Sequence, residues 1–308
     1  MAVVTRARRA TDAVADSADT VLRLAVLLQA GVTPARAWGH LASSGDPAAG
    51  RIEAQLALGT PLAEAVRVAA AGARGDGWDD IAAAWEVATT VGAPLAETLR
   101  GLSVALRDAQ QTTDDVRVAL AEPAGTARLL GWLPLVGAGL GAALGFDTVG
   151  VLFGTLGGLA CLIGGGALAL AGRGWSARLV ARAAPPGGVP GMGAELLAIA
   201  LGGGVSVERA GDIVAHARRG HDGALASTEP DTAGILRLST EAGVPAVELL
   251  RASAVLARHR ARVEGRLAAA RLSGRLLIPL GVCTLPSFVL LGVAPMLLSV
   301  FAAVPLRI

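Results

Sequence analysis

The chain has 308 residues, of which 53% are hydrophobic and only 17% are charged. Soluble globular chains carry about 25% charged residues. The shortage is local, because residues 129–172 and 276–306 contain a single charged side chain, Asp147. This composition excludes a wholly soluble enzyme, a disulfide-stapled secreted domain and a disordered protein, and it argues against a transporter built mostly of membrane helices.

The two uncharged stretches predict three membrane spans. A span needs about 20 apolar residues, so residues 129–172 are long enough for two helices, about 129–146 and 150–172, joined by a tight loop at Asp147. Residues 276–306 contain four prolines and predict one span, about 277–300, kinked by proline.

Glycines recur at every fourth position on the first two predicted spans. Rows of small residues allow membrane helices to approach closely, so we expect these glycines at a helix contact. The alternative is that glycine is simply frequent, with 41 in the chain. The row consists of Gly137, Gly141, Gly145, Gly150, Gly154 and Gly158.

Arginines flank the predicted spans and predict their orientation, because basic loops stay on the cytoplasmic side. They precede the first and third spans and follow the second, whereas residues 146–149 contain none. All 27 basic residues are Arg, and Lys, Asn and Tyr are absent, which indicates a GC-rich bacterial genome. We expect a multi-pass protein of the bacterial inner membrane with both charged parts in the cytosol. The flanking residues are Arg128, Arg173, Arg178, Arg182, Arg271 and Arg275.

The two charged parts are related in sequence. Residues 92–108 and 243–259, which are 151 positions apart, share seven identities in 17 positions. Residues 31–37 resemble 204–210 at an offset of 173, so the second copy lacks about 22 residues in its middle. Both copies contain glycine turns followed by apolar residues at helical spacing, which is typical of helix hairpins.

We therefore expect an all-α fold with two tandem, related cytosolic helical bundles. The predicted boundaries are a first helical domain at 1–127, a transmembrane hairpin at 128–172, a second helical domain at 173–275 and a C-terminal transmembrane helix at 276–304.

Three segments carry a resemblance to a known family. They are residues 27–38 (Leu-Leu-Gln-Ala-Gly-Val-Thr-Pro-Ala-Arg-Ala-Trp), the helices after Gly92 and Gly243, and the closing stretch 285–296. Together with the duplication, they resemble the type II secretion system F-domain family, the inner-membrane platform proteins of type II secretion, type IV pili and Tad pili. The last segment looks like that of TadC and TadB members.

The resemblance implies a non-enzymatic platform that couples a cytosolic assembly ATPase to the extraction of pilin or pseudopilin. It implies a homo- or hetero-oligomer in contact with membrane lipid, with a second F-domain protein as one option for a partner. It implies no cofactor, no metal, no nucleic-acid partner and no catalytic residue. The alternatives are a membrane transporter or permease subunit, and a membrane-anchored signalling adaptor.

The candidate partner interface is a row of arginines in the second charged part, Arg251, Arg258, Arg262 and Arg266, whose spacing places them on one helix face. Residues 1–128 carry 12 Arg and 15 acidic residues, whereas residues 173–275 carry 14 and 9. We expect the row to meet the acidic first part, the ATPase or anionic lipid headgroups. A solvated helix face in an arginine-rich chain is the alternative.

Overall fold

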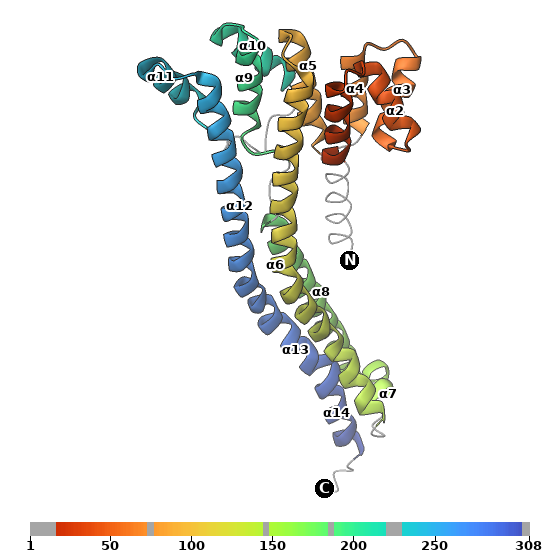
Figure 1. The fold of residues 1–308 in the computed structure, drawn as a ribbon. Coiled ribbons are helices and arrows are strands. Elements are labelled where there is room, and N and C mark those ends of the chain that lie inside the picture. Colours follow the sequence, from red (N-terminus) through yellow and green to blue (C-terminus); the bar gives the residue numbers. More distant parts are fainter. Residues whose placement is uncertain (1–16, 73–76, 144–147, 184–187, 220–229, 304–308) are drawn as a thin grey trace. The chain divides into compact units, whose positions relative to one another are not determined.

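The computed structural model describes residues 17–72, 77–143, 148–183, 188–219 and 230–303 (Figure 1). Contacts divide the chain into two compact units. Unit 1 comprises Met1–Asp114 with Pro185–Gly265, and unit 2 comprises Asp115–Ala184 with Arg266–Ile308. Every regular element among the described residues is a helix, which confirms the predicted all-α fold class.

The first copy of the repeat opens unit 1 with short helices separated by tight turns. A helix at 17–29 is followed by α2 (Pro34–Ser43), α3 (Pro47–Ala57), α4 (Leu62–Gly72), α5 (Trp78–Val91) and the long α6 (Leu95–Ala143). Asp46 caps α3 by accepting hydrogen bonds from the N–H groups of Ala48 and Ala49, both at 2.9 Å. The turn before α6 depends on Gly92, whose φ of +73° is a left-handed conformation that suits glycine.

The second copy repeats this order with fewer helices. It contains α9 (Met192–Gly202), α10 (Val207–Ala217), α11 (Thr232–Ala242) and the long α12 (Ala246–Pro279). α10 starts 173 residues after α2, and α12 starts 151 residues after α6, the two offsets found in the sequence. Between the matching helices the first copy has α3 and α4. These two helices account for the residues that the second copy lacks.

One hydrophobic core runs through both copies. It includes Trp85 of α5 and Leu99 of α6 from the first copy, and Leu196 of α9 and Leu250 of α12 from the second. The ring of Trp38 lies 6.5 Å from that of Trp78 and 6.0 Å from that of Trp85, so three indoles fill the middle of the first copy. The charge-based boundaries at 127 and 173 stay a prediction, because the compact units join segments distant in sequence.

Helix α5 connects the two copies. It packs against α4 of its own copy and against α9 and α10 of the other (Figure 1). A Cβ atom added at Gly203, next to α9, would lie 2.8 Å from the Cβ of Val91. Glycine at 203 therefore allows the end of α9 to approach Val91 of α5 closely.

Unit 2 contains the apolar helices. It includes the later part of α6, α7 (Thr148–Gly154), α8 (Leu156–Ala183) and the chain from Arg266 onward. Two described helical stretches are long and apolar enough to cross a membrane, Leu156–Val180 and Ala246–Leu298. The latter contains the predicted span at 277–300 as far as Leu298. In the predicted span at 129–146, α6 continues to Ala143. Most side chains of this span and the loop residue Asp147 lie outside the described residues.

The helix predicted at 150–172 is broken, which corrects that expectation. The chain bends at Thr155, and α8 then continues to Ala183. The Thr155 hydroxyl donates to the carbonyl oxygen of Val151 at 2.8 Å and accepts from the N–H of Gly158 at 3.0 Å. The threonine side chain thus ends α7 and caps α8. Such side-chain hydrogen bonds compete with the backbone hydrogen bonds of a helix, and a hydropathy pattern does not reveal them.

In the last apolar stretch, wide π-helical turns precede two of the prolines. After α12 the chain continues as the π-helical segment η1 (Leu280–Thr284), α13 (Leu285–Phe288), η2 (Val289–Val293) and α14 (Ala294–Ala303). Pro286 follows η1 and Pro295 follows η2. Because a proline ring clashes with the carbonyl four residues earlier, the wider turn accommodates each ring without ending the helix.

We predict that Gly203→Ala lowers the stability of the protein while Gly202→Ala does not. The first substitution pushes a methyl group into Val91, at a typical overpacking cost of about 1–3 kcal/mol. The second places it in open space. Thermal unfolding of the full-length protein in detergent, followed by circular dichroism, measures both. Equal midpoints for the two variants would contradict the packing of α9 against α5.

Candidate interfaces

Three of the four predicted arginines lie on the part of α12 that belongs to unit 1, and they meet acidic side chains. Arg258 has the most enclosed position, with 7% of its side chain exposed. Its Nε lies 3.6 Å from Asp108 Oδ2 on α6, and its Nη1 lies 3.5 Å from Glu195 Oε2 on α9. Moving a guanidinium out of water is costly unless it is paired, so these two carboxylates determine where Arg258 can lie.

The next two arginines of the row also contact α6, and both are less buried than Arg258. Arg262 Nη2 donates to Asp108 Oδ1 at 3.2 Å and to Gln111 Oε1 at 3.3 Å. Arg251 is 44% exposed and lies 4.0 Å from Glu97. Asp108 therefore forms ion pairs with two arginines of α12, and the arginine row links α12 to α6 within unit 1.

The fourth arginine makes its contact in unit 2. Arg266 donates from Nε and Nη2 to Asp115 Oδ2, at 3.1 and 2.8 Å. The pair is partly open to solvent, with 61% of the arginine side chain exposed, and exposed pairs of this kind add little to stability. All four predicted residues thus contact acidic residues of α6. Their role as a surface for an ATPase or for lipid headgroups stays a prediction.

Some of these contacts join residues at equivalent positions of the two copies. Gln111 and Arg262, and likewise Asp115 and Arg266, are equivalent positions at the offset of 151. Equivalent positions can meet only close to an axis that relates the two copies. Arg107 and Arg258 are also equivalent, and each pairs with an acid on the first helix of its own copy, Asp19 at 3.2 Å and Glu195 at 3.5 Å.

The predicted glycine row is only partly at a contact. Gly158 packs against α7, since an added Cβ would lie 2.7 Å from the Cα of Leu152. Gly154 faces open space, and Gly150 is exposed. The surroundings of Gly137 and Gly141 and the whole of Gly145 lie outside the described part of the chain. A role of this row in helix packing therefore stays a prediction for those three positions.

Two further glycines of α8, outside the predicted row, lie close to the C-terminal segment. A Cβ at Gly165 would lie 2.6 Å from Leu291 Cγ, and one at Gly172 would lie 2.9 Å from the Cβ of Cys283. The buried Ser287 hydroxyl donates to the carbonyl oxygen of Gly165 at 2.8 Å. These glycines are seven residues apart, the repeat of a helix–helix seam, so a search at heptad spacing would have found them.

One further contact had no clear signal in the sequence. Asp80, at the start of α5, accepts a hydrogen bond from the N–H of Val189 at 2.9 Å and so ties the two copies together. Cys283 is buried and Cys161 half-buried, both as free thiols. Within the described residues, no group of three His, Cys, Asp or Glu side chains is placed to hold a metal ion.

Fold and contacts together define a class of protein: a duplicated helical unit whose long helices continue into apolar segments. Residues 21–141 match the family model described as type II secretion system (T2SS), protein F. This match confirms, over these residues, the resemblance seen in the sequence. Comparison with curated proteins and with solved structures gives no match.

Proteins of this family are non-catalytic platform proteins of the inner membrane that work with secretion ATPases and pilins. The match covers the first copy of the repeat and the start of the apolar region. The second copy lies outside it, so its assignment rests on the helix order and offsets described above.

We predict that Arg258→Ala destabilises the protein by about 3 kcal/mol, because it leaves Glu195 and Asp108 without their shared partner. The matched control is Arg251→Ala, at an exposed pair, which should cost less than about 1 kcal/mol. Urea unfolding of the full-length protein in detergent compares the two. Equal losses would show that the enclosed pairs carry no special weight.

We also predict that Gly165→Leu disrupts unit 2 and that Gly166→Leu does not. The two positions are adjacent and equally apolar, but only Gly165 faces Leu291, and an added Cβ at Gly166 meets nothing within 4 Å. Resistance to unfolding by SDS in mixed micelles measures the difference. A loss at Gly166 equal to that at Gly165 would contradict the contact between α8 and the C-terminal helix.

Proposed function

We propose that this protein is a non-enzymatic platform of the inner membrane for pilus assembly or type II-like secretion, which couples a cytosolic ATPase to the extraction of pilin or pseudopilin. The carrying observation is the protein F domain at residues 21–141, joined in the same chain to a second copy and to apolar helices. The corresponding topology has both helical copies in the cytosol, three spans, and a C-terminus on the outer side, as the flanking arginines favour.

Helix continuity supports a mechanical role. Both α6 and α12 contribute residues to each compact unit, so each helix leads from the soluble copy into an apolar segment without a break in the described chain. A helix transmits displacement along its axis because every turn is fixed by hydrogen bonds to the next. Under this proposal, an ATPase acting on unit 1 moves the membrane segments through these two helices.

The transporter alternative is not favoured. A carrier needs ionisable or polar groups at the depth of the membrane. The described apolar residues 156–172 and 277–298 contain no charged side chain and no histidine.

The test uses a deletion strain complemented with wild type, with Ala270→Pro or with Ala270→Ser. Ala270 is an exposed position in α12, and proline inside a helix costs about 3 kcal/mol and breaks its hydrogen bonding. We expect wild type and the serine control to restore surface filaments or secretion. The proline variant should insert in the membrane and co-purify with the ATPase, but it should not restore either function.

Two results would contradict the proposal. Filaments and secretion that are normal in the deletion strain would exclude a platform role. Full function of the Ala270→Pro variant would exclude coupling through α12.

A further inference from the structure

One helix of the second copy is much less buried than its counterpart in the first copy. Helices α5 and α11 are equivalent, since they end 151 residues apart. Eight residues of α5 are buried, whereas α11 has no buried residue. The difference is one of surroundings: α5 packs against α4 on its own copy and against α9 and α10 of the next, whereas α11 packs this extensively against no described helix and only Ile235 and Leu236 lie against the common core.

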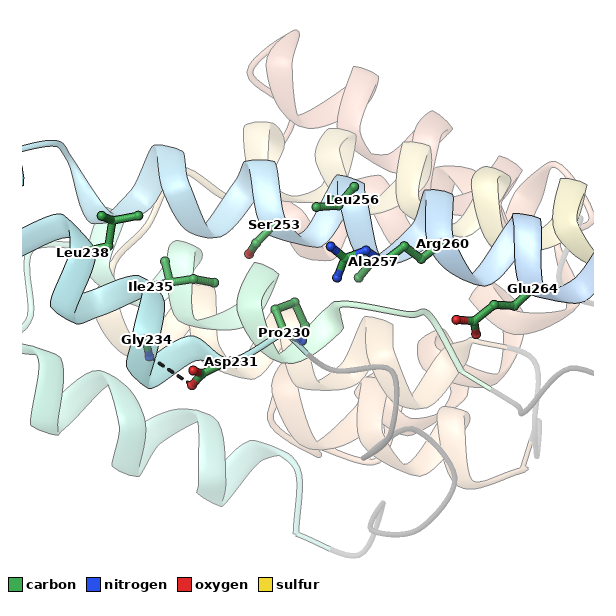
Figure 2. A pocket seen from close by; sticks show the side chains of 10 residues that line it. All are labelled: Pro230, Asp231, Gly234, Ile235, Leu238, Ser253, Leu256, Ala257, Arg260 and Glu264. Carbon is green, nitrogen blue, oxygen red and sulfur yellow. Dashed lines mark hydrogen bonds between the residues drawn. The ribbon is translucent and has the colours of Figure 1, made fainter.

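The uncovered face of α11 forms an open groove with α12, about 440 Å³ in volume. Figure 2 shows Ile235 and Leu238 pointing from α11 toward α12. Leu238 is 52% exposed and Leu256, on α12, is 46% exposed. Figure 1 shows α11 at one side of unit 1, with α9 and α10 between it and α5. The groove therefore lies at the free end of the array of helices.

We propose that the exposed face of α11 beside this groove binds a second copy of this chain through its first two helices, residues 17–29 and α2. The internal contact between the copies is the template. In it, α5 of copy one binds α9 and α10, the first two helices of copy two. Repeating that step places the first two helices of another molecule against α11. The proposal concerns self-association and does not depend on the identity of the ATPase or the filament.

The residues at the matching positions fit such a contact. Val91 lies against Gly203 inside the chain, and the equivalent positions are Ala242 and Ala30, both exposed. A Val–Gly pair and an Ala–Ala pair have nearly the same volume, so the two backbones can approach equally closely. Val26 is 51% exposed, while its counterpart on α9, Ile199, is buried at 6%. Helix 17–29 thus presents an apolar side chain where the internal contact buries one.

Charge also permits this arrangement. Inside the chain His216 lies 3.7 Å from Glu86. The equivalent positions are Ser43 and Arg237, both exposed, so no like charges would face each other.

The orientation of the long helices is compatible with a membrane. In unit 1 the ion pairs between α6 and α12 advance together along both helices, from Glu97–Arg251 to Asp108–Arg262. The two helices therefore run in the same direction. A step that relates α6 to α12 keeps the long helices of every added molecule parallel, as a shared bilayer requires. Because the contact joins two different surfaces, it produces a ring or an open chain.

The test is disulfide cross-linking in native membranes, starting from a full-length variant with Cys161→Ala and Cys283→Ala. One tagged molecule carries Ala30→Cys and a differently tagged one carries Ala242→Cys. Coexpression and mild oxidation should give a cross-linked pair that contains both tags, since the template brings the two Cβ positions within disulfide range. Both substitutions are at exposed positions, so folding should be unaffected.

The matched control replaces Ala30→Cys by Leu58→Cys, at a residue that is 78% exposed at the end of α3. It should give no mixed pair. Adding Leu238→Glu to the Ala242→Cys molecule should reduce the Ala30–Ala242 cross-link at least several-fold. A product containing only Ala242→Cys molecules would indicate a symmetric contact and overturn the proposal. Absence of any cross-link with Ala30→Cys would also overturn it and leave the groove to a different protein.

Discussion

The fold depends on the burial of α5 between the two copies of the repeat. Short, alanine-rich helices have little apolar area each, and burial contributes about 25 cal/mol per Å², so a four- or six-helix copy has little to stabilise it alone. By packing against α4 on one side and against α9 and α10 on the other, α5 buries eight of its residues. The other helices of unit 1 are arranged around this contact, and the hydrogen bond from Val189 to Asp80 fixes its N-terminal end.

The ionic contacts of α12 have a different role from the core. Apolar packing is non-directional, whereas a guanidinium enclosed between two carboxylates specifies which residues must be opposite each other. Arg258 and Arg262 both pair with Asp108, and Gln111 meets its own equivalent, Arg262. These contacts fix the register of two long helices whose alanine-rich surfaces would permit sliding. That requirement explains why charges are kept in a part of unit 1 that is largely closed to water.

Much of the architecture could be predicted from local sequence signals. The glycine turns at Gly92 and Gly243 and the two repeat offsets gave the helix order, because turn chemistry and helical periodicity act over a few residues. The shared core could not be predicted in this way, since residues such as Trp85 and Leu196 are distant in sequence and equally apolar in any arrangement. The break at Thr155 was missed because one hydroxyl outweighs the hydropathy of its neighbours. Glycine spacing was predicted at four residues, whereas the contacts of α8 recur at seven.

The two π-helical turns near the C-terminus change which side of the last helix faces its neighbour. Each wide turn inserts one extra residue into the helical path, and one residue corresponds to a rotation of about 100°. Two insertions therefore rotate everything after Val293 by about 200° relative to a regular α-helix. Leu298, which lies 3.6 Å from the Cβ position of Gly157, would be drawn on the opposite side by an ordinary helical wheel. The π-helical turns at the prolines must therefore be taken into account before any residue of that segment is assigned a position facing lipid or protein.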